Sequence, residues 1–263
     1  MTTDAPRLHV EVDGDGPTIV LGHGFGGSAR NFRAQARGLA PRFRVVRFDA
    51  RGHARSEAPA DPAAYRPEAF VADVERVLDQ VGAATAVVGG LSMGAGIALR
   101  FAHAHPQRTR ALVLASFPAG RDVAGSFKAV AEDFAATIER EGLEAAGERF
   151  VWGPDAGLEP RAAALIRQGF LEHAPYALAA TLRQVIGVQP TAAEMEDVLR
   201  TTVQPVLLIA GDRDLPAVAA SRALAARLPD ARVAVIADAG HLVNVAQPAA
   251  FNAAVEAFLR DVP

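Results

Sequence analysis

A serine within a glycine-rich turn is the strongest chemical motif of the chain. Residues 90–94 read GLSMG, which has the spacing G-x-S-x-G. An apolar run precedes this turn and the helical pattern Met93–Ala104 follows it. A serine on a sharp turn between a strand and a helix exposes its hydroxyl above the sheet, and the helix N-terminus favours developing negative charge. Ser92 is therefore the candidate nucleophile. The alternative is a small-residue turn in which Ser92 only caps the helix.

A serine hydroxyl is a weak nucleophile that needs a base, and the base needs an acid to orient it. Two segments supply these groups, GDRD at 211–214 and Gly-His at 240–241, and each follows an apolar or β-branched run. The carboxyl ends of parallel strands meet at one edge of a sheet, so Asp214 and His241 are expected near Ser92. Each also has a plainer interpretation. Asp214 could be a solvated loop carboxylate, and His241 a helix cap or a core histidine.

A second glycine-rich turn, HGFGGS at 23–28, follows another apolar run. Such a turn can aim a backbone N–H at the carbonyl oxygen that Ser92 would attack. The N–H groups of Phe25 and Met93 are the candidate oxyanion hole. His23 is a competing base, although a histidine before glycine in such a loop more plausibly props the turn. Glycine loops also cradle phosphates, but the chain has no G-x-x-x-x-G-K-[ST] motif.

The elements that must position these groups alternate along the chain. Short apolar or alternating runs predict strands at Leu8–Val12, Pro17–Leu21, Arg44–Phe48, Ala84–Val88, Ala111–Ala115, Pro205–Ala210 and Arg232–Ile236. A period near 3.6 residues predicts helices at Pro67–Val81, Met93–Ala104, Ala217–Leu228 and Pro248–Leu259. Strands that alternate with helices indicate an α/β fold with a mostly parallel, doubly wound sheet. The acidic residues Asp73 and Glu75 are expected on solvated helix faces.

One long stretch breaks this alternation. Between residues 118 and 200 only helical patterns are evident, at Gly125–Glu141, Leu143–Phe150, Pro160–Glu172, Pro175–Ile186 and Ala192–Leu199. A single crossover rarely needs so many residues, so a helical insertion between two strands is predicted. The predicted core therefore comprises residues 1–117 and 201–263, with the insertion at 118–200.

Composition excludes several classes of function. The 263 residues are 50% hydrophobic and 22% charged, with a net charge of -3, which is typical of a folded protein without a basic surface for nucleic acid. The absence of cysteine excludes disulfides, thiolate metal sites and a Cys nucleophile. No histidine pair has metal-ligand spacing, so neither a metal nor a cofactor is predicted. Without a signal-peptide pattern or a membrane-length apolar run, we expect a cytoplasmic monomer or homodimer that acts on a small molecule, with no membrane or nucleic-acid partner.

Taken together, the motifs resemble the α/β-hydrolase fold family, in its capped esterase, lactonase and C–C hydrolase branch. The resemblance rests on HGFGGS at 23–28, DARGHARS at 49–56, GLSMGA at 90–95, GDRD at 211–214 and GH at 240–241. It implies Ser92 as nucleophile, Asp214 as acid and His241 as base. It also implies the N–H groups of Phe25 and Met93 as oxyanion donors, and the insertion as a cap over the site. The turn at 49–53 is mainly structural in the family.

The expected activity is cleavage of carboxylic esters of uncharged apolar or aromatic acyl groups through an acyl-enzyme on Ser92. A lactonase resembling enol-lactonases, or a C–C bond hydrolase, would use the same triad. A non-catalytic ligand receptor on this fold is the alternative of another class. Phe25, Met93 and Trp152 are expected to contact substrate, although packing is the commoner role of a tryptophan such as Trp152. His173, in the insertion, is either a substrate contact or a structural residue.

Overall fold

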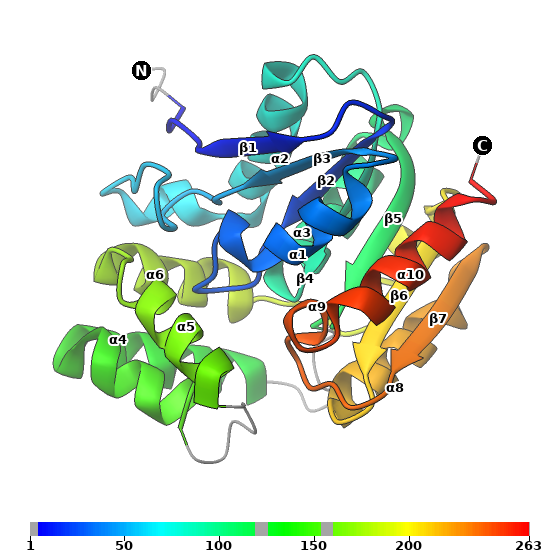
Figure 1. The fold of residues 1–263 in the computed structure, drawn as a ribbon. Coiled ribbons are helices and arrows are strands. Elements are labelled where there is room, and N and C mark those ends of the chain that lie inside the picture. The colour runs from blue at the N-terminus through cyan, green and yellow to red at the C-terminus, as the bar shows by residue number, and fades with distance from the viewer. Residues whose placement is uncertain (1–4, 119–125, 154–159, 263) are drawn as a thin grey trace.

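A seven-stranded sheet forms the centre of the protein. The computed structural model describes residues 5–118, 126–153 and 160–262 (Figure 1). The strands are β1 (Val10–Asp13), β2 (Thr18–Gly22), β3 (Arg44–Phe48), β4 (Ala86–Leu91), β5 (Thr109–Ala115), β6 (Val206–Gly211) and β7 (Ala231–Ile236). Their order in the sheet is β1-β3-β2-β4-β5-β6-β7. Only β1 runs antiparallel to its neighbour. The predicted α/β class and mostly parallel sheet are confirmed.

Helices cover both faces of the sheet. One face carries α2 (Pro67–Gln80), α3 (Met93–Ala104) and α8 (Leu215–Ala225), and the other carries α1 (Arg33–Leu39), α9 (Val243–Ala246) and α10 (Pro248–Leu259) (Figure 1). Short 3₁₀ turns lie at Ala29–Phe32, Pro62–Tyr65 and Pro106–Arg108. Because successive strand residues point to opposite faces, Val20 and Val46 join one core while Ile19 and Val45 join the other. The buried apolar runs of the sequence are the consequence of this double cover.

The helical insertion lies between β5 and β6. Its elements are α4 (Ser126–Phe150), α5 (Pro160–Phe170), α6 (Pro175–Thr181), the π-helical turn η5 (Leu182–Ile186) and α7 (Glu196–Thr201). Gly142, with φ of 86°, kinks α4 at the boundary predicted between two helices. Helices α4, α5 and α6 group together beyond the ends of β5 and β6 (Figure 1) and share a small core that includes Phe134, Phe170 and Leu178. The insertion is confirmed, while its limits at 118 and 200 stay predictions.

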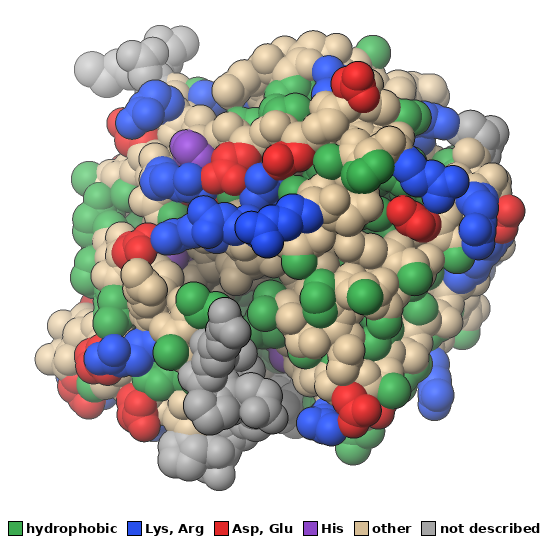
Figure 2. Space-filling view, in the orientation of Figure 1, with side chains coloured by type: hydrophobic (Ala, Val, Ile, Leu, Met, Phe, Trp, Pro, Cys, Tyr) green, Lys and Arg blue, Asp and Glu red, His purple; other side chains and the backbone are tan. Residues whose placement is uncertain are grey.

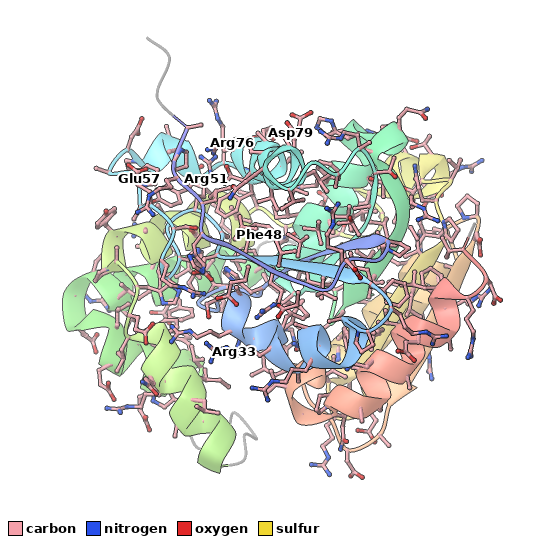
Figure 3. All side chains as sticks on the ribbon, turned by 45° about the horizontal axis from the view of Figure 1, so that its top comes forward. Arg33, Phe48, Arg51, Glu57, Arg76 and Asp79 are labelled. Carbon is pink, nitrogen blue, oxygen red and sulfur yellow. The ribbon has the colours of Figure 1, made fainter. Side chains whose placement is uncertain are left out.

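The prediction for Asp73 is wrong, because this carboxylate is only 1% exposed. Arg51, from the loop after β3, lies near Arg76 of α2 (Figure 3). Its guanidinium binds both oxygens of Asp73, also in α2, at 2.7 Å. The third guanidinium nitrogen of Arg51, Nη1, donates to the Ala64 carbonyl at 2.6 Å. The Asp73 carboxylate can stay buried because Arg51 binds both of its oxygens, and main-chain carbonyls accept the remaining hydrogen bonds of the guanidinium. Glu75 remains partly exposed, as expected.

Charged side chains on the surface are mixed in sign. Figure 2 shows Lys and Arg side chains beside Asp and Glu side chains at several places on one face. Just beneath the surface the buried Arg47 binds Glu11 at 2.9 Å and Asp13 at 2.5 Å, and the exposed Arg55 binds Glu11 at 2.7 Å. Within the described ranges, no helix has the length and apolar character needed to cross a membrane.

Candidate active site

Ser92 lies on a strained turn between β4 and α3. Its φ of 52° and ψ of -111° are rare for a residue with a side chain, and it precedes the first residue of α3. The Ser92 amide donates to the Ala115 carbonyl at 2.8 Å. A Cβ atom on Gly90 or Gly94 would lie 2.4 or 2.1 Å from the Gly22 carbonyl oxygen. Both glycines of the motif are therefore required because the end of β2 passes directly behind the turn.

Asp214 and His241 meet at the same edge of the sheet. His241 Nδ1 lies 2.6 Å from Asp214 Oδ2, and Asp214 Oδ1 accepts a 3.2 Å hydrogen bond from the Ala217 amide in the first turn of α8. Burial disfavours the charge on Asp214, but the hydrogen bond and the charge of His241 outweigh it and lower the pKa of the carboxyl. His241 is half exposed and Asp214 is largely covered. The pair has the geometry of an acid that orients an imidazole.

Asp212, the other carboxylate of the GDRD segment, has a different partner. Its Oδ1 accepts a 3.2 Å hydrogen bond from the Ala239 amide, and the Arg213 amide donates to the Ala239 carbonyl at 2.9 Å. Asp212 thus anchors the loop that carries His241 but does not bond to its ring. Asp212 therefore supports the loop, whereas Asp214 orients the imidazole.

The serine and the histidine are connected through the end of β5. No hydrogen bond joins the Ser92 hydroxyl to His241 in the described part of the protein, and such contacts are often long before substrate binds. The main-chain amide of Ser92 donates to the Ala115 carbonyl. Ser116, the residue after Ala115, donates its hydroxyl to the His241 carbonyl at 2.7 Å. No sequence motif indicates Ser116; the available signal is its position directly after the predicted strand Ala111–Ala115.

Within the described ranges, the turn at 23–28 leaves the Phe25 amide without an acceptor and engages both ring nitrogens of His23. Among the residues that the structure describes, the Phe25 N–H has no hydrogen-bond acceptor, and Met93 supplies the first amide of α3, which has no acceptor inside the helix. His23 Nδ1 donates to the Gly24 carbonyl at 2.7 Å, and His23 Nε2 accepts from the Ala50 amide at 2.9 Å. Burial lowers the pKa of His23 to about 4. Both ring nitrogens prop the turn, so neither is available as a base.

Aromatic side chains of the insertion pack on this turn. The Phe25 ring meets Phe134 and Phe170 edge-on, with centroids 5.5 and 6.3 Å apart. Gly26 has φ of 66°, and a Cβ atom there would lie 2.5 Å from the Phe170 ring. Glycine is required at this position for both reasons. The turn that carries Phe25 is thus in direct contact with the insertion.

His173 joins the insertion to the same turn through backbone atoms. Its Nδ1 lies 3.0 Å from the Phe170 carbonyl oxygen and its Nε2 3.0 Å from that of Gly27. Burial lowers the pKa of His173 and of the neighbouring His53. His53 is fully buried, and its Nδ1 donates to the Arg51 carbonyl at 3.0 Å. The structure gives both histidines structural partners.

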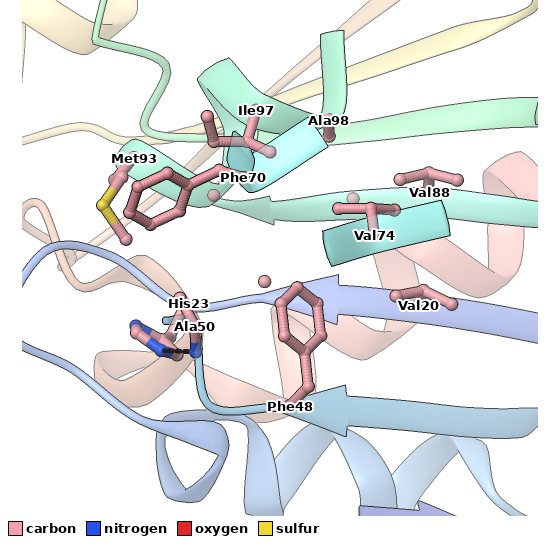
Figure 4. Close-up of a pocket in the computed structure, with 13 residues that line it drawn as sticks. Val20, His23, Phe48, Ala50, Phe70, Val74, Val88, Met93, Ile97 and Ala98 are labelled. Carbon is pink, nitrogen blue, oxygen red and sulfur yellow. Dashed lines mark hydrogen bonds between the residues drawn. The ribbon is translucent and has the colours of Figure 1, made fainter. Parts of the chain in front are cut away.

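Trp152 and Met93 have hydrophobic surroundings. Trp152 is 9% exposed within the core of the insertion, with its ring 5.5 Å from that of Phe170. Met93 borders a cavity of about 20 Å³ beneath the turn, which Phe48 and Val74 also line (Figure 4). An apolar cavity of this size is expected to stay dry. Contact of Trp152, Met93 or Phe25 with substrate stays a prediction.

The chain is similar to known proteins over its whole length. A family model described as the alpha/beta hydrolase fold matches residues 17–151. A Bacillus subtilis (strain 168) protein provisionally named 2-succinyl-6-hydroxy-2,4-cyclohexadiene-1-carboxylate synthase is 30% identical over 270 residues, which span 99% of this chain and 97% of that protein.

Two solved structures extend the comparison to the fold. A thermophilic esterase from Thermogutta terrifontis, bound to malate, is 28% identical with a TM-score of 0.87, covering 100% of this chain and 96% of the esterase. The enol-lactonase from Burkholderia xenovorans LB400 is 29% identical with a TM-score of 0.85, covering 98% of both chains. With the strained serine turn and the Asp–His pair at one sheet edge, these matches place the chain in the α/β-hydrolase fold family.

Proposed function

We propose that the protein is a serine hydrolase that cleaves carboxylic esters of uncharged apolar or aromatic acyl groups. The hydrogen bond between Asp214 and His241, at the edge that carries the strained Ser92, is the observation that supports it most directly. An imidazole that donates from Nδ1 to a carboxylate has its Nε2 free to accept a proton. This is the state in which a histidine can activate a serine.

The reaction then proceeds in two stages. His241 accepts the Ser92 proton as the serine oxygen attacks the ester carbonyl carbon, and the Phe25 and Met93 amides donate to the resulting oxyanion. His241 returns the proton to the departing alcohol, which leaves an acyl group on Ser92. Water that gives its proton to His241 attacks this acyl group, and collapse of the second oxyanion releases the acid and restores the Ser92 hydroxyl.

The described part of the insertion supports an uncharged acyl group. Aromatic rings of Phe134 and Phe170 pack against Phe25, the proposed oxyanion donor. Arg183 is held by Glu132 and Glu139 on the surface. Because this guanidinium is already bound by two carboxylates, it is a poor partner for an anionic substrate. Apolar surface should therefore contribute more to acyl recognition than charge, at about 0.8 kcal/mol for each buried methylene.

Lactone hydrolysis is the second candidate. The enol-lactonase of Burkholderia xenovorans LB400 matches this chain at 29% identity over 98% of both chains. A lactone is a cyclic ester, so the same attack and the same oxyanion donors would open it. The difference between the two activities would lie in the shape of the acyl pocket and not in the reacting residues.

A substrate panel with a labelling experiment tests the proposal. Wild type and Ser92→Ala would be assayed on p-nitrophenyl esters, lactones and diketones, and a serine-directed phosphonate would be located by mass spectrometry. We expect ester or lactone turnover that falls by about 10³-fold or more in Ser92→Ala, and a label on Ser92 alone. Ligand binding without turnover would instead indicate a receptor, and a label on another residue would remove Ser92 as the nucleophile.

A further inference from the structure

A second serine, Ser116, lies at the centre of the candidate site. It directly follows β5, is fully buried, and has φ of 45°. This left-handed backbone conformation is uncommon for residues other than glycine, asparagine and aspartate. The backbone conformation alone does not favour serine at this position, so the hydroxyl is the feature that needs a physical reason.

The hydrogen bonds around Ser116 reach all three segments of the proposed triad. The Ser116 amide donates to the Ile209 carbonyl at 2.8 Å, in the strand that leads to the acid. The preceding carbonyl, of Ala115, accepts from the Ser92 amide at 2.8 Å. The Ser116 hydroxyl donates to the His241 carbonyl at 2.7 Å. Since β5 lies between β4 and β6 in the sheet, residue 116 is the position from which all three can be reached.

The loop that carries His241 needs such a constraint. The imidazole is half exposed, and its ring is fixed through Nδ1 by the Asp214 carboxylate. That single bond leaves the imidazole free to pivot about Nδ1, which would swing Nε2 away from the serine. Fixing the main-chain carbonyl of the same residue removes this freedom, because the backbone and the ring are then both held. The hydroxyl of Ser116 supplies the second point of attachment.

We propose that Ser116 is a positioning residue whose hydroxyl holds the main chain of His241 so that Nε2 faces Ser92. The inference rests on the proposed serine-hydrolase function. It assigns the effect to the hydroxyl and not to the shape of the turn. Glycine would adopt the turn without strain but would leave the His241 carbonyl without its donor, whereas threonine would keep a donor at the cost of a crowded backbone.

Because glycine relieves the backbone strain but lacks the hydroxyl, and threonine does the reverse, stability and activity should rank these variants in opposite orders. Ser116→Ala, Ser116→Gly and Ser116→Thr would be compared with wild type by thermal unfolding, by ester kinetics and by the rate of phosphonate labelling at Ser92. We expect Ser116→Gly to be more stable than Ser116→Thr, yet about 10-fold slower in kcat and labelling. KM should stay within about twofold in each variant, because no substrate contact is lost.

A matched control removes another buried serine hydroxyl. Ser56 donates to the Asp49 carbonyl at 2.5 Å and accepts from the His9 amide at 2.9 Å, outside the site. Ser56→Ala should lower the unfolding temperature without slowing labelling. If the activities of the Ser116 variants followed their stabilities, or if Ser116→Gly kept wild-type kcat and labelling rate, the residue would be structural and the proposal overturned.

A spectroscopic measurement separates this inference from the proposed function. The proton between His241 Nδ1 and Asp214 should give a low-field NMR resonance, which we expect to shift or broaden in Ser116→Gly and to stay unchanged in Ser56→Ala. An unchanged resonance in Ser116→Gly would count against positioning even if Ser92 were proved to be the nucleophile. Labelling at a residue other than Ser92 would overturn the proposed function, while the resonance would still report whether Ser116 holds His241.

Discussion

Replacing Asp214 with asparagine should reverse the hydrogen bond that orients His241. Both carboxylate oxygens are acceptors in the structure, Oδ2 from His241 Nδ1 and Oδ1 from the Ala217 amide. Asparagine offers one acceptor oxygen and one NH₂ donor. The Ala217 amide can only donate, so the oxygen is expected to stay there and the NH₂ group to face the imidazole. Nδ1 must then accept, which moves the ring proton to Nε2.

This change removes the proton acceptor from the position facing Ser92. A comparable loss in other triads lowers kcat about 10⁴-fold, which corresponds to about 5.5 kcal/mol of transition-state stabilisation. We expect a similar loss of ester turnover in Asp214→Asn. Folding should be little affected, because the side chain keeps its bond to the Ala217 amide at the start of α8.

Asp212→Asn is the matched control on the same segment. The Asp212 oxygen accepts from the Ala239 amide, and an asparagine oxygen can accept the same bond. Turnover should therefore stay within about threefold of wild type. Steady-state kinetics on a p-nitrophenyl ester and the labelling rate at Ser92 would measure both variants. Equal losses in the two, or more than a tenth of wild-type kcat in Asp214→Asn, would refute the assignment of the acid.

Two further predictions concern stability. Burial lowers the pKa of His23 to about 4. Between pH 6.5 and 4 the His23 imidazole is therefore protonated in the unfolded chain but neutral in the native protein. The free energy of unfolding should fall by about 3 kcal/mol as the pH drops through this window. Urea unfolding at pH 7 and pH 5 should show about 2 kcal/mol of this loss, and His23→Gln should reduce the difference. Gly26→Ala should lower stability by about 1–3 kcal/mol, since its Cβ meets the Phe170 ring. Gly169→Ala, where the added Cβ would meet no atom of the described residues within 4 Å apart from its chain neighbours and its own helix backbone, should not destabilise the protein. Equal thermal shifts in the two variants would contradict the clash.

The sheet was predictable because its central strands are buried on both faces. Runs such as Ala111–Ala115 and Pro205–Ala210 are apolar along their length because helices cover both sides, and this pattern is visible in the sequence. The edge rule for parallel strands also indicated that Asp214 and His241 would lie together, and the structure places them 2.6 Å apart. Their roles in catalysis remain for the kinetic variants to test.

Pairings between distant polar residues were not predictable. Asp73 sits on an amphipathic helix, and nothing in its local pattern shows that Arg51 will cover it. The short helix α1 was also missed, because Arg33–Leu39 contains only two turns and mixed polarity. Ser116 directly follows the predicted strand Ala111–Ala115, and no local motif marks it. Its significance depends on the His241 carbonyl, which is 125 positions further along the chain.

Backbone strain in the described residues is concentrated at the edge that carries the candidate site. Of the four residues other than glycine with positive φ, Ser92 and Ser116 follow β4 and β5, and Asp238 lies just after β7. Such conformations persist only where the surrounding contacts hold them. At Ser92 and Ser116 the contacts are main-chain hydrogen bonds to adjacent strands, which a rigid sheet can maintain. A glycine at either position should relieve the backbone strain and increase stability, but it would also remove the serine hydroxyl. Stability and activity should therefore change in opposite directions at this edge.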